Sequence, residues 1–258
     1  MEGGSSSRLS LPQVTLCAVS CVNVAATIRA MERSLAQIDF AAARLLTDAP
    51  LPPHPAIEIL PIPRISSSRA YSDFILRDLL DYIDTSHCLI VQWDGHVIDA
   101  TRWTPDFLNQ DYIGARWPQV SDDYNVGNGG FSLRSRRLMH LCRDPAFWRQ
   151  HPEDVAIGRI NRPWLEEQGL SFATPALADL FSTERAGDLS CSFGYHGAWL
   201  MPQAIGVPAF WALYPGLDDR STIRHDFPAI LKQIGRGRGG WARAARLIRD
   251  RIFFREGR

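Results

Sequence analysis

The stretch VTLCAVSCV, Val14 to Val22, leaves few folds open to this chain. It is apolar almost throughout and rich in β-branched residues, which is typical of a strand covered on both faces. Asn23 follows and can cap a helix, and apolar residues then recur at helical spacing, at Val24, Ile28, Met31, Leu35 and Ile38. The pattern predicts a buried strand that leads directly into an amphipathic helix.

Three further apolar segments read as strands, at Ala43–Pro50, Ala56–Ile62 and His87–Gln92. Ser66–Ser68 can cap a helix over Tyr71 to Ile83. A repeated strand–helix–strand order predicts an α/β fold, with a mostly parallel central sheet flanked by helices. In such sheets ligands bind beyond the carboxyl ends of the strands, and Asp94 lies just beyond one of them.

The remainder of the chain predicts shorter elements and one domain. We expect short helices at Trp103–Phe107 and Ser135–Leu141, a short strand at Tyr112–Trp117, a glycine-rich loop entering a strand over Tyr124–Ser135, and a helix over His151–Gly169 with acids in its first turn. Proline or glycine breaks most of Pro175–Pro215. No repeat and no clear linker precedes Leu231. The predicted divisions are a disordered lead-in at 1–12, one domain at 13–230 and a basic amphipathic segment at 231–258.

Charge is spread unevenly along a chain whose net formal charge is +0. Residues 231–258 hold nine basic residues against Asp250 and Glu256, a net charge of +7, so residues 1–230 carry −7. A main body with this charge is not expected to bind nucleic acid. No apolar stretch approaches the roughly 20 residues that span a bilayer, and the N-terminal MEGGSSSRLS lacks the apolar core of a secretion signal. The five cysteines are scattered with no CxxC pair, so we expect a reduced, cytoplasmic protein.

Four polar stretches are candidates for chemistry, and each also has a structural interpretation. Asp94 could be a turn residue, and Gly127–Gly130 could be either a hairpin turn or a place where backbone closely approaches a ligand. Glu153 and Asp154 could simply favour a helix start, and a lone histidine such as His196 is often structural. There is no GxxxxGK[ST] loop and no GxGxxG after the first strand. Neither an ordinary P-loop nucleotide hydrolase nor a Rossmann dehydrogenase is therefore supported.

The order of these stretches resembles that of the A-type glycosyltransferase fold: an Asp-x-Asp motif, a glycine loop, an x-Glu-Asp motif and a late histidine. The strings VQWDG, DYIGARW, VGNGGFSLRS, PEDVAI and FGYHG look like a bacterial family of glycosyltransferase-like domains of unknown function, and the resemblance covers about Val14 to Trp199. Gln92 stands where many relatives of the fold have the first aspartate of the Asp-x-Asp motif. The resemblance implies a single domain of the A-type glycosyltransferase fold.

The resemblance also implies site roles. It places Mn²⁺ or Mg²⁺ on Asp94 and His196, and it places the nucleotide-sugar donor on Gln92, Trp93, Asp94, Gly127, Asn128, Gly129 and Gly130. Asp154 would be the general base, with Glu153 orienting the acceptor or the base, and Glu153 and Glu184 are the alternative bases. The aromatic rings of Trp93, Trp117 and Tyr195 could stack on sugar faces or pack in the core.

The implied reaction is transfer to a hydroxyl of a glycan or glycolipid acceptor, with inversion at the anomeric carbon. A non-catalytic sugar-binding domain and a metal-dependent hydrolase are the alternatives, although no HExxH motif is present.

The C-terminal segment has the composition of a basic helix that binds membrane surfaces. Apolar residues recur at helical spacing, at Trp241, Ala244, Ala245, Ile248 and Ile252. Arginines occupy positions between them. Gly235–Gly240 would serve as its hinge. The segment predicts either peripheral contact with an anionic membrane, at the inner face of the cell membrane, or a helix packed on the domain with its arginines in water.

Overall fold

The computed structural model describes residues 8–121 and 123–253. Strand β1 (Leu9–Val19) is an inner strand of its central sheet. It pairs in parallel with β2 (Ile38–Thr47) on one side and with β4 (His87–Ile90) on the other, and most of its side chains are buried. The expected buried strand is confirmed. It begins at Leu9, so residues 9–12 of the expected lead-in belong to the sheet, while residues 1–7 lie outside the described residues.

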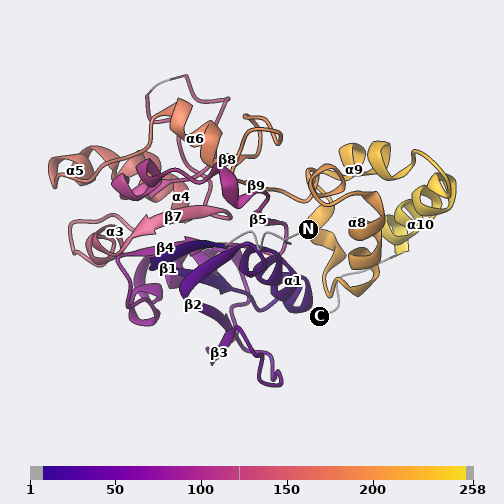
Figure 1. The fold of residues 1–258 in the computed structure, drawn as a ribbon, viewed down its shortest axis with the longest axis horizontal. Coiled ribbons are helices and arrows are strands. Elements are labelled where there is room, and N and C mark those ends of the chain that lie inside the picture. The colour runs from indigo at the N-terminus through magenta and orange to yellow at the C-terminus, as the bar shows by residue number, and fades with distance from the viewer. Residues whose placement is uncertain (1–7, 122, 254–258) are drawn as a thin grey trace, which may run out of the picture.

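The central sheet has six strands in the order β3-β2-β1-β4-β7-β6 (Figure 1). Strand β3 (Glu58–Pro61) is parallel to β2, whereas β7 (Ser132–Ser135) is antiparallel to both β4 and β6 (Tyr112–Ile113). The sheet is therefore mixed, and the expectation of a mostly parallel sheet was wrong for this half. The chain leaves β4 at its carboxyl end, and the glycine loop re-enters the sheet from that same end, so β7 must run in the opposite direction.

Helix α1 (Val24–Leu35) follows β1 as expected, but it ends before Ile38, which begins β2 beside Leu9. Asn23 precedes α1 in a left-handed conformation and makes no side-chain cap. Its amide instead accepts from the Asp219 N–H and donates to the Asp219 carbonyl, which ties the start of α1 to the C-terminal helices. Ser67 caps α2 (Ser68–Arg77), as expected for Ser66–Ser68, and Ser135 caps α3 (Arg136–Leu141), the short helix expected there.

A second sheet of three short strands stands beyond the carboxyl ends of the parallel strands. It pairs β5 (Gly95–Val97) antiparallel with β9 (Gly194–His196), which is parallel to β8 (Ser182–Thr183). Before β8 the chain forms α4 (Glu153–Val155), which is continued by a wide helical turn at Ala156–Ile160. Two further helices follow, α5 (Arg162–Glu167) and α6 (Pro175–Phe181). The expected helix over His151–Gly169 is thus interrupted.

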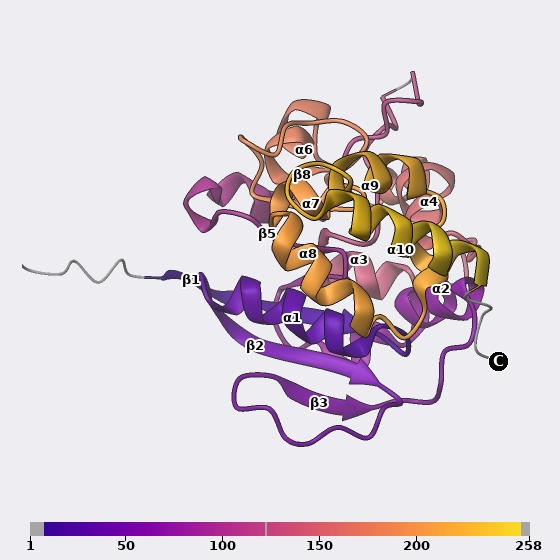
Figure 2. The ribbon, with the colours of Figure 1, turned by 90° about the vertical axis from the view of Figure 1, so that its right-hand side faces the viewer.

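The C-terminal helices form a lobe beside the sheets (Figures 1 and 2). These are α7 (Met201–Ala204), α8 (Val207–Leu213), α9 (Phe227–Ile234) and α10 (Gly240–Phe253). They share one apolar core with Ala26 of α1 and Tyr195 of β9. Helix α9 crosses the boundary expected at Leu231, and the protein is a single α/β domain with helices on its mixed sheet. Among the described residues no helix has the length and apolar character needed to cross a membrane.

Candidate functional site

Asp94 and His196 lie side by side because the second sheet pairs their neighbours. Gly95 is opposite His196 in the β5–β9 ladder, and the Gly197 N–H donates to the Asp94 carbonyl at 3.0 Å. His196 Nε2 lies 3.5 Å from Asp94 Oδ1, and both side chains are mostly buried. The structure therefore brings together two residues that are about a hundred positions apart in the sequence.

Glu184 completes this cluster from the end of β8. Its Oε1 lies 3.4 Å from His196 Nδ1, so the imidazole ring stands between two carboxylates, one at each nitrogen. The sequence suggested Glu184 only as an alternative base. The parallel β8–β9 pairing, which sets Thr183 opposite Tyr195, is what carries Glu184 to the histidine.

The two carboxylates hold His196 in its charged form. Burial opposes the charge, but the negative charges of Asp94 and Glu184 outweigh it and raise the pKa of His196 to about 9. Burial alone would raise the pKa of Glu184, but its hydrogen bond and charge interaction with His196 give a net lowering. At neutral pH the ring is an imidazolium that faces a carboxylate on each side.

Gln92 and Asn128 fix the histidine further. Gln92 Oε1 lies 3.2 Å from His196 Nε2, and its amide donates to the Tyr71 hydroxyl at 3.0 Å. Asn128 Oδ1 accepts the Gly130 N–H at 3.0 Å, and the Asn128 amide nitrogen lies 3.1 Å from His196 Nδ1. Both nitrogens carry hydrogen when the ring is charged, so the amide donates instead to Glu184, and this hydrogen bond contributes to the lowered pKa of Glu184. Of the expected donor-binding residues, Gln92, Asp94 and Asn128 therefore converge on His196.

The glycine loop is packed against the acidic and basic side chains of the site. A side chain at Gly130 would overlap the His196 ring, and one at Gly129 would overlap the Glu153 carboxylate. A side chain at Gly127 would likewise overlap the ring of Trp117. These glycines are needed for close packing within the protein, and their contact with a donor stays a prediction.

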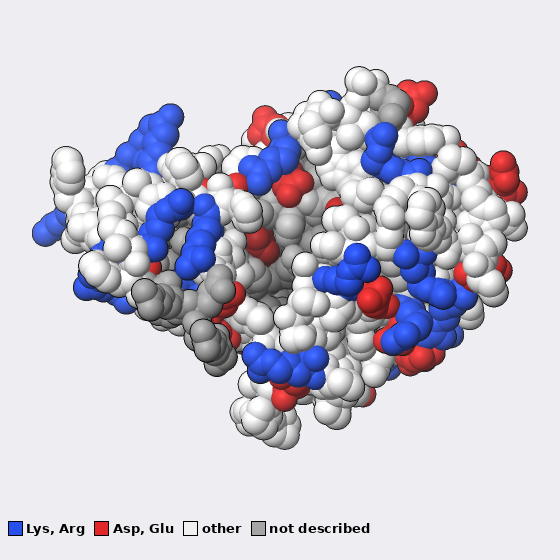
Figure 3. Space-filling view, turned by 180° about the vertical axis from the view of Figure 1, so that it is seen from behind, with Lys and Arg blue, Asp and Glu red and all other residues white. Residues whose placement is uncertain are grey.

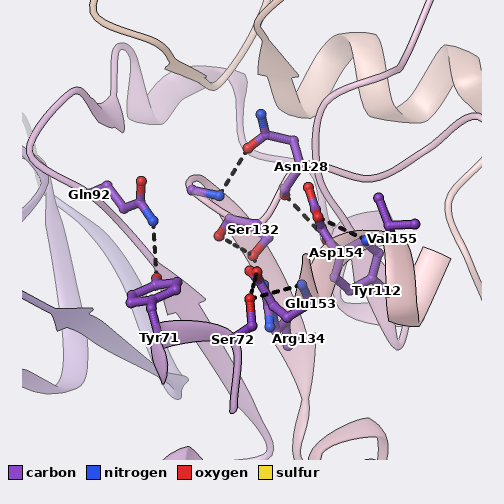
Figure 4. A network of polar contacts seen from close by, with 12 residues as sticks. Tyr71, Ser72, Gln92, Tyr112, Asn128, Ser132, Arg134, Glu153, Asp154 and Val155 are labelled. Atoms are coloured by element: carbon purple, nitrogen blue, oxygen red, sulfur yellow. Dashed lines mark hydrogen bonds and ion pairs between the residues drawn. The ribbon is translucent and has the colours of Figure 1, made fainter. Parts of the chain in front are cut away.

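Glu153 is a buried partner of Arg134. The two form an ion pair at 3.1 Å with side chains 8% and 2% exposed, and Ser72 donates a hydrogen bond to the second carboxylate oxygen (Figure 4). The Ser72 hydroxyl also accepts the Glu153 N–H at 3.2 Å. These contacts give Glu153 a positioning role, because they hold the start of α4, which carries Asp154, against α2 and β7.

Asp154 lacks such a partner. Its carboxylate accepts the Val155 N–H at 2.8 Å, and no Arg, Lys or His within the described chain forms an ion pair with it. Burial and the nearby Glu153 charge raise the pKa of Asp154 to about 6. A carboxylate with this pKa is mostly ionised at pH 7 and is more basic than an ordinary aspartate.

Beside this cluster a pocket opens at the carboxyl ends of β1 and β4. It has a volume of about 340 Å³ and is bordered by the residues after β1, by Arg64 to Ser68 before α2, and by Tyr71, Gln92 and Trp93. The chain leaves β1 toward β2 on one side and reaches β4 on the other, so the pocket lies where the strand order reverses. Figure 3 shows the molecule hollowed between its two lobes, with acidic side chains inside the hollow.

Two of the three aromatic residues suggested for sugar stacking are in the core instead. Tyr195 is fully buried and Trp117 is 8% exposed, against Gly127. Trp93 alone borders the pocket, while it also packs against the core of the C-terminal lobe. Stacking on a ligand is thus open to Trp93 and closed to the other two.

Asp94 and His196 suit two ligands of one divalent cation. Two ligands each about 2.1 Å from an ion lie roughly 3 to 3.5 Å apart when they are neighbours in its shell, and Asp94 Oδ1 has no hydrogen-bond partner among the described residues. Within the described ranges, no group of three or more His, Cys, Asp or Glu residues could hold a metal ion. Further ligands would have to come from the bound substrate or from amide oxygens such as that of Gln92.

A family model described as a protein of unknown function, DUF5672, matches residues 55–196, more than half of the 258 residues. The match includes Gln92, the glycine loop, Asp154, Glu184 and His196, while β1 and its side of the pocket lie before it. A search of curated proteins found no match.

Proposed function

Because the chain belongs to the DUF5672 family, whose function is unknown, we propose its activity from its own site: transfer of a sugar from a nucleotide diphosphate to a hydroxyl of a glycan or lipid-linked acceptor. One observation carries the proposal. Gln92 lines the pocket and also contacts His196, so the pocket lies next to the charged cluster. A nucleotide in the pocket would direct its diphosphate toward His196 and Asp94.

The pocket has the features that a nucleotide requires. A volume of about 340 Å³ is within the usual range for small-molecule sites. The N-terminus of α2 faces it at Ser67 and Ser68, where free backbone N–H groups and the helix dipole favour a phosphate. Arg64, which pairs with Asp48 at 3.3 Å and is otherwise exposed, would turn a positive charge toward the phosphate, and Trp93 offers an aromatic face.

The leaving diphosphate needs positive charge as the sugar departs. The His196 imidazolium, which contacts Gln92 at the border of the pocket, would supply it within the protein. Mn²⁺ or Mg²⁺, when bound, would neutralise the same charge as a Lewis acid, held by Asp94 and His196. Such binding requires a neutral His196, so proton and metal compete for Nε2, and metal affinity rises with pH.

Asp154 is the base in this proposal. Its carboxylate would accept the proton of the acceptor hydroxyl as that oxygen attacks, and its raised pKa suits the task near neutral pH. Glu153 stays paired with Arg134 and keeps Asp154 in place. One base acting opposite the leaving group gives a product with inverted anomeric configuration.

A panel of nucleotide sugars tests the proposal. The protein is incubated with each sugar nucleotide, with and without Mn²⁺, and both thermal stabilisation and release of the nucleoside diphosphate are measured. We expect one class of donor to bind and react, and Asp94→Ala to abolish the reaction. Asp106→Ala, which changes an exposed acid in the Pro105–Asn109 turn, is the matched control and should retain it. The proposal fails if no donor binds or if Asp94→Ala keeps full activity.

A further inference from the structure

Helix α10 packs on the C-terminal lobe with one narrow face. Leu247 is 1% exposed and joins the core of this lobe, beside Ile230 and Ile234 of α9. Asp250 is buried next to it, where it accepts hydrogen bonds from the Tyr214 hydroxyl at 3.1 Å and from Arg220 at 2.9 Å. The expected alternative of a helix packed on the domain is therefore what the structure shows.

The segment before α10 is held in place. The Arg243 guanidinium donates to the carbonyls of Ile234, Arg236 and Arg238, at 2.8, 2.8 and 3.0 Å. Gly240 lies so close to Gly235 that a side chain there would overlap the Gly235 carbonyl. Gly235–Gly240 is thus a clamped turn, and the expectation of a hinge was wrong because Arg243 ties its carbonyls together.

The opposite face of α10 is an exposed apolar stripe, which we define as Trp241, Ala245, Ile248 and Ile252. Their spacing of four, three and four residues places them on one line along the helix. Trp241 is 91% exposed and Ile252 is 65% exposed, although both are large apolar side chains that usually seek cover. Helix α10 therefore buries one face, which holds Leu247 and Asp250, while no described residue covers the apolar stripe on the other.

Arginines border the stripe on both sides. At 100° per residue, Arg249 falls on one flank and Arg251 on the other, and both are exposed. Arg249 also pairs with Asp250 at 3.2 Å and Arg251 lies over the Phe227 ring at 4.3 Å, so each contacts the protein while part of its side chain faces solvent. Arg236 and Arg238 are exposed in the clamped turn at the start of the helix. Figure 2 shows α10 across the front of the C-terminal lobe, and Figure 3 shows basic side chains spread over that lobe.

We propose that the stripe binds an anionic lipid surface, with Trp241, Ile248 and Ile252 entering the interface and the flanking arginines contacting lipid phosphates. A single helix with an apolar line and cations on both sides is complementary to a flat, negatively charged bilayer face. Tryptophan is favoured at such an interface because its ring is apolar and its N–H is polar. The clamp on Gly235–Gly240 presents the stripe without any rearrangement of the helix. This proposal does not rest on the transferase activity.

Vesicle co-sedimentation tests it, using the full chain with phosphatidylcholine vesicles and with vesicles that also contain phosphatidylglycerol. We expect binding to the anionic vesicles that weakens in high salt, and weak binding to the neutral ones. The triple variant Trp241→Ser, Ile248→Ser, Ile252→Ser should reduce the partition coefficient at least about tenfold, since three interfacial side chains are lost. The matched control is Trp148→Ser with Leu180→Ser, which removes exposed apolar side chains outside α10 and should leave binding unchanged.

Circular dichroism and light scattering of the same variants complete the test. The stripe variant should keep the helical spectrum, because its replaced side chains are exposed. Equal partitioning of wild type and stripe variant would overturn the proposal, as would equal loss in the control. A concentration-dependent dimer that the stripe variant abolishes, without any vesicle binding, would assign the stripe to a second copy of the chain instead. Because no catalytic readout is used, a failed transferase assay would not affect these outcomes.

Discussion

Replacing Glu153 with Gln should destabilise the protein strongly, because it leaves Arg134 charged in the interior. The Arg134 side chain is 2% exposed and its ion pair with Glu153 measures 3.1 Å. Removing one partner of a buried pair costs about 3–5 kcal/mol of the free energy of unfolding. Gln keeps an amide oxygen that can accept from Arg134, so we expect the lower end, about 3 kcal/mol. That is a large part of a typical total of about 5–15 kcal/mol.

Urea denaturation followed by tryptophan fluorescence measures this loss. With a slope of about 3 kcal/mol per M, the midpoint should fall by about 1 M, and the slope itself should not change. The matched control is Glu58→Gln, because the Glu58 side chain is 55% exposed and its partner Arg44 retains Asp84 at 2.8 Å. The control should lose less than about 1 kcal/mol. Equal losses in both variants, or a loss below about 1 kcal/mol in Glu153→Gln, would refute the reasoning.

Four further predictions concern Asp154 and the charged cluster. Asp154→Asn should lower transfer by about 10²–10⁴-fold while nucleotide binding, measured by calorimetry, survives; near-normal turnover would move the base to Glu184. Because the pKa of Asp154 is raised to about 6, the wild-type rate should fall roughly tenfold per pH unit below pH 6, and a flat pH–rate profile there would exclude this base. Asp94→Asn should lower the pKa of His196 from about 9, as followed by NMR of the imidazole. The raised pKa of His196 stabilises the folded state below its unfolded value of about 6.5, and this contribution disappears as the pH rises through about 9, so the wild type should lose stability over that range relative to Asp94→Asn.

The sequence predicted the elements whose signals are local. Two faces of apolar side chains marked β1, and the serines at Ser66–Ser68 marked the cap of α2, which Ser67 provides. The direction of β7 could not be read in this way, because a four-residue strand has the same pattern in a parallel and an antiparallel sheet. Strands β5, β8 and β9 are too short to have any periodicity, so the second sheet was missed.

The sequence predicted which residues form the site, but it did not predict the strand pairing and the ion pair that hold them together. Asp94 and His196 were expected together, but the ladder that joins them depends on the unseen second sheet. Arg134 appeared in the sequence only as a polar residue in a short strand, and its burial makes sense only with Glu153 opposite it. Nothing in the sequence indicates that Gly129 and Gly130 are required for the packing of Glu153 and His196, because the fold alone brings these side chains against the loop.

Because β5 and β9 pair over only three residues, insertions and deletions within these two segments should disturb the site more than substitutions do. Asp94 directly precedes β5 and His196 is the last residue of β9, so neither has slack between it and the ladder. Since side chains alternate across a strand, one inserted residue in either segment would exchange the positions of Tyr195 and His196 and turn a buried phenol toward Asp94. Relatives that preserve this site should therefore vary in length within residues 185–191, outside the paired strands, and keep the spacing from Asp94 to Val97 and from Gly194 to His196 free of insertions and deletions.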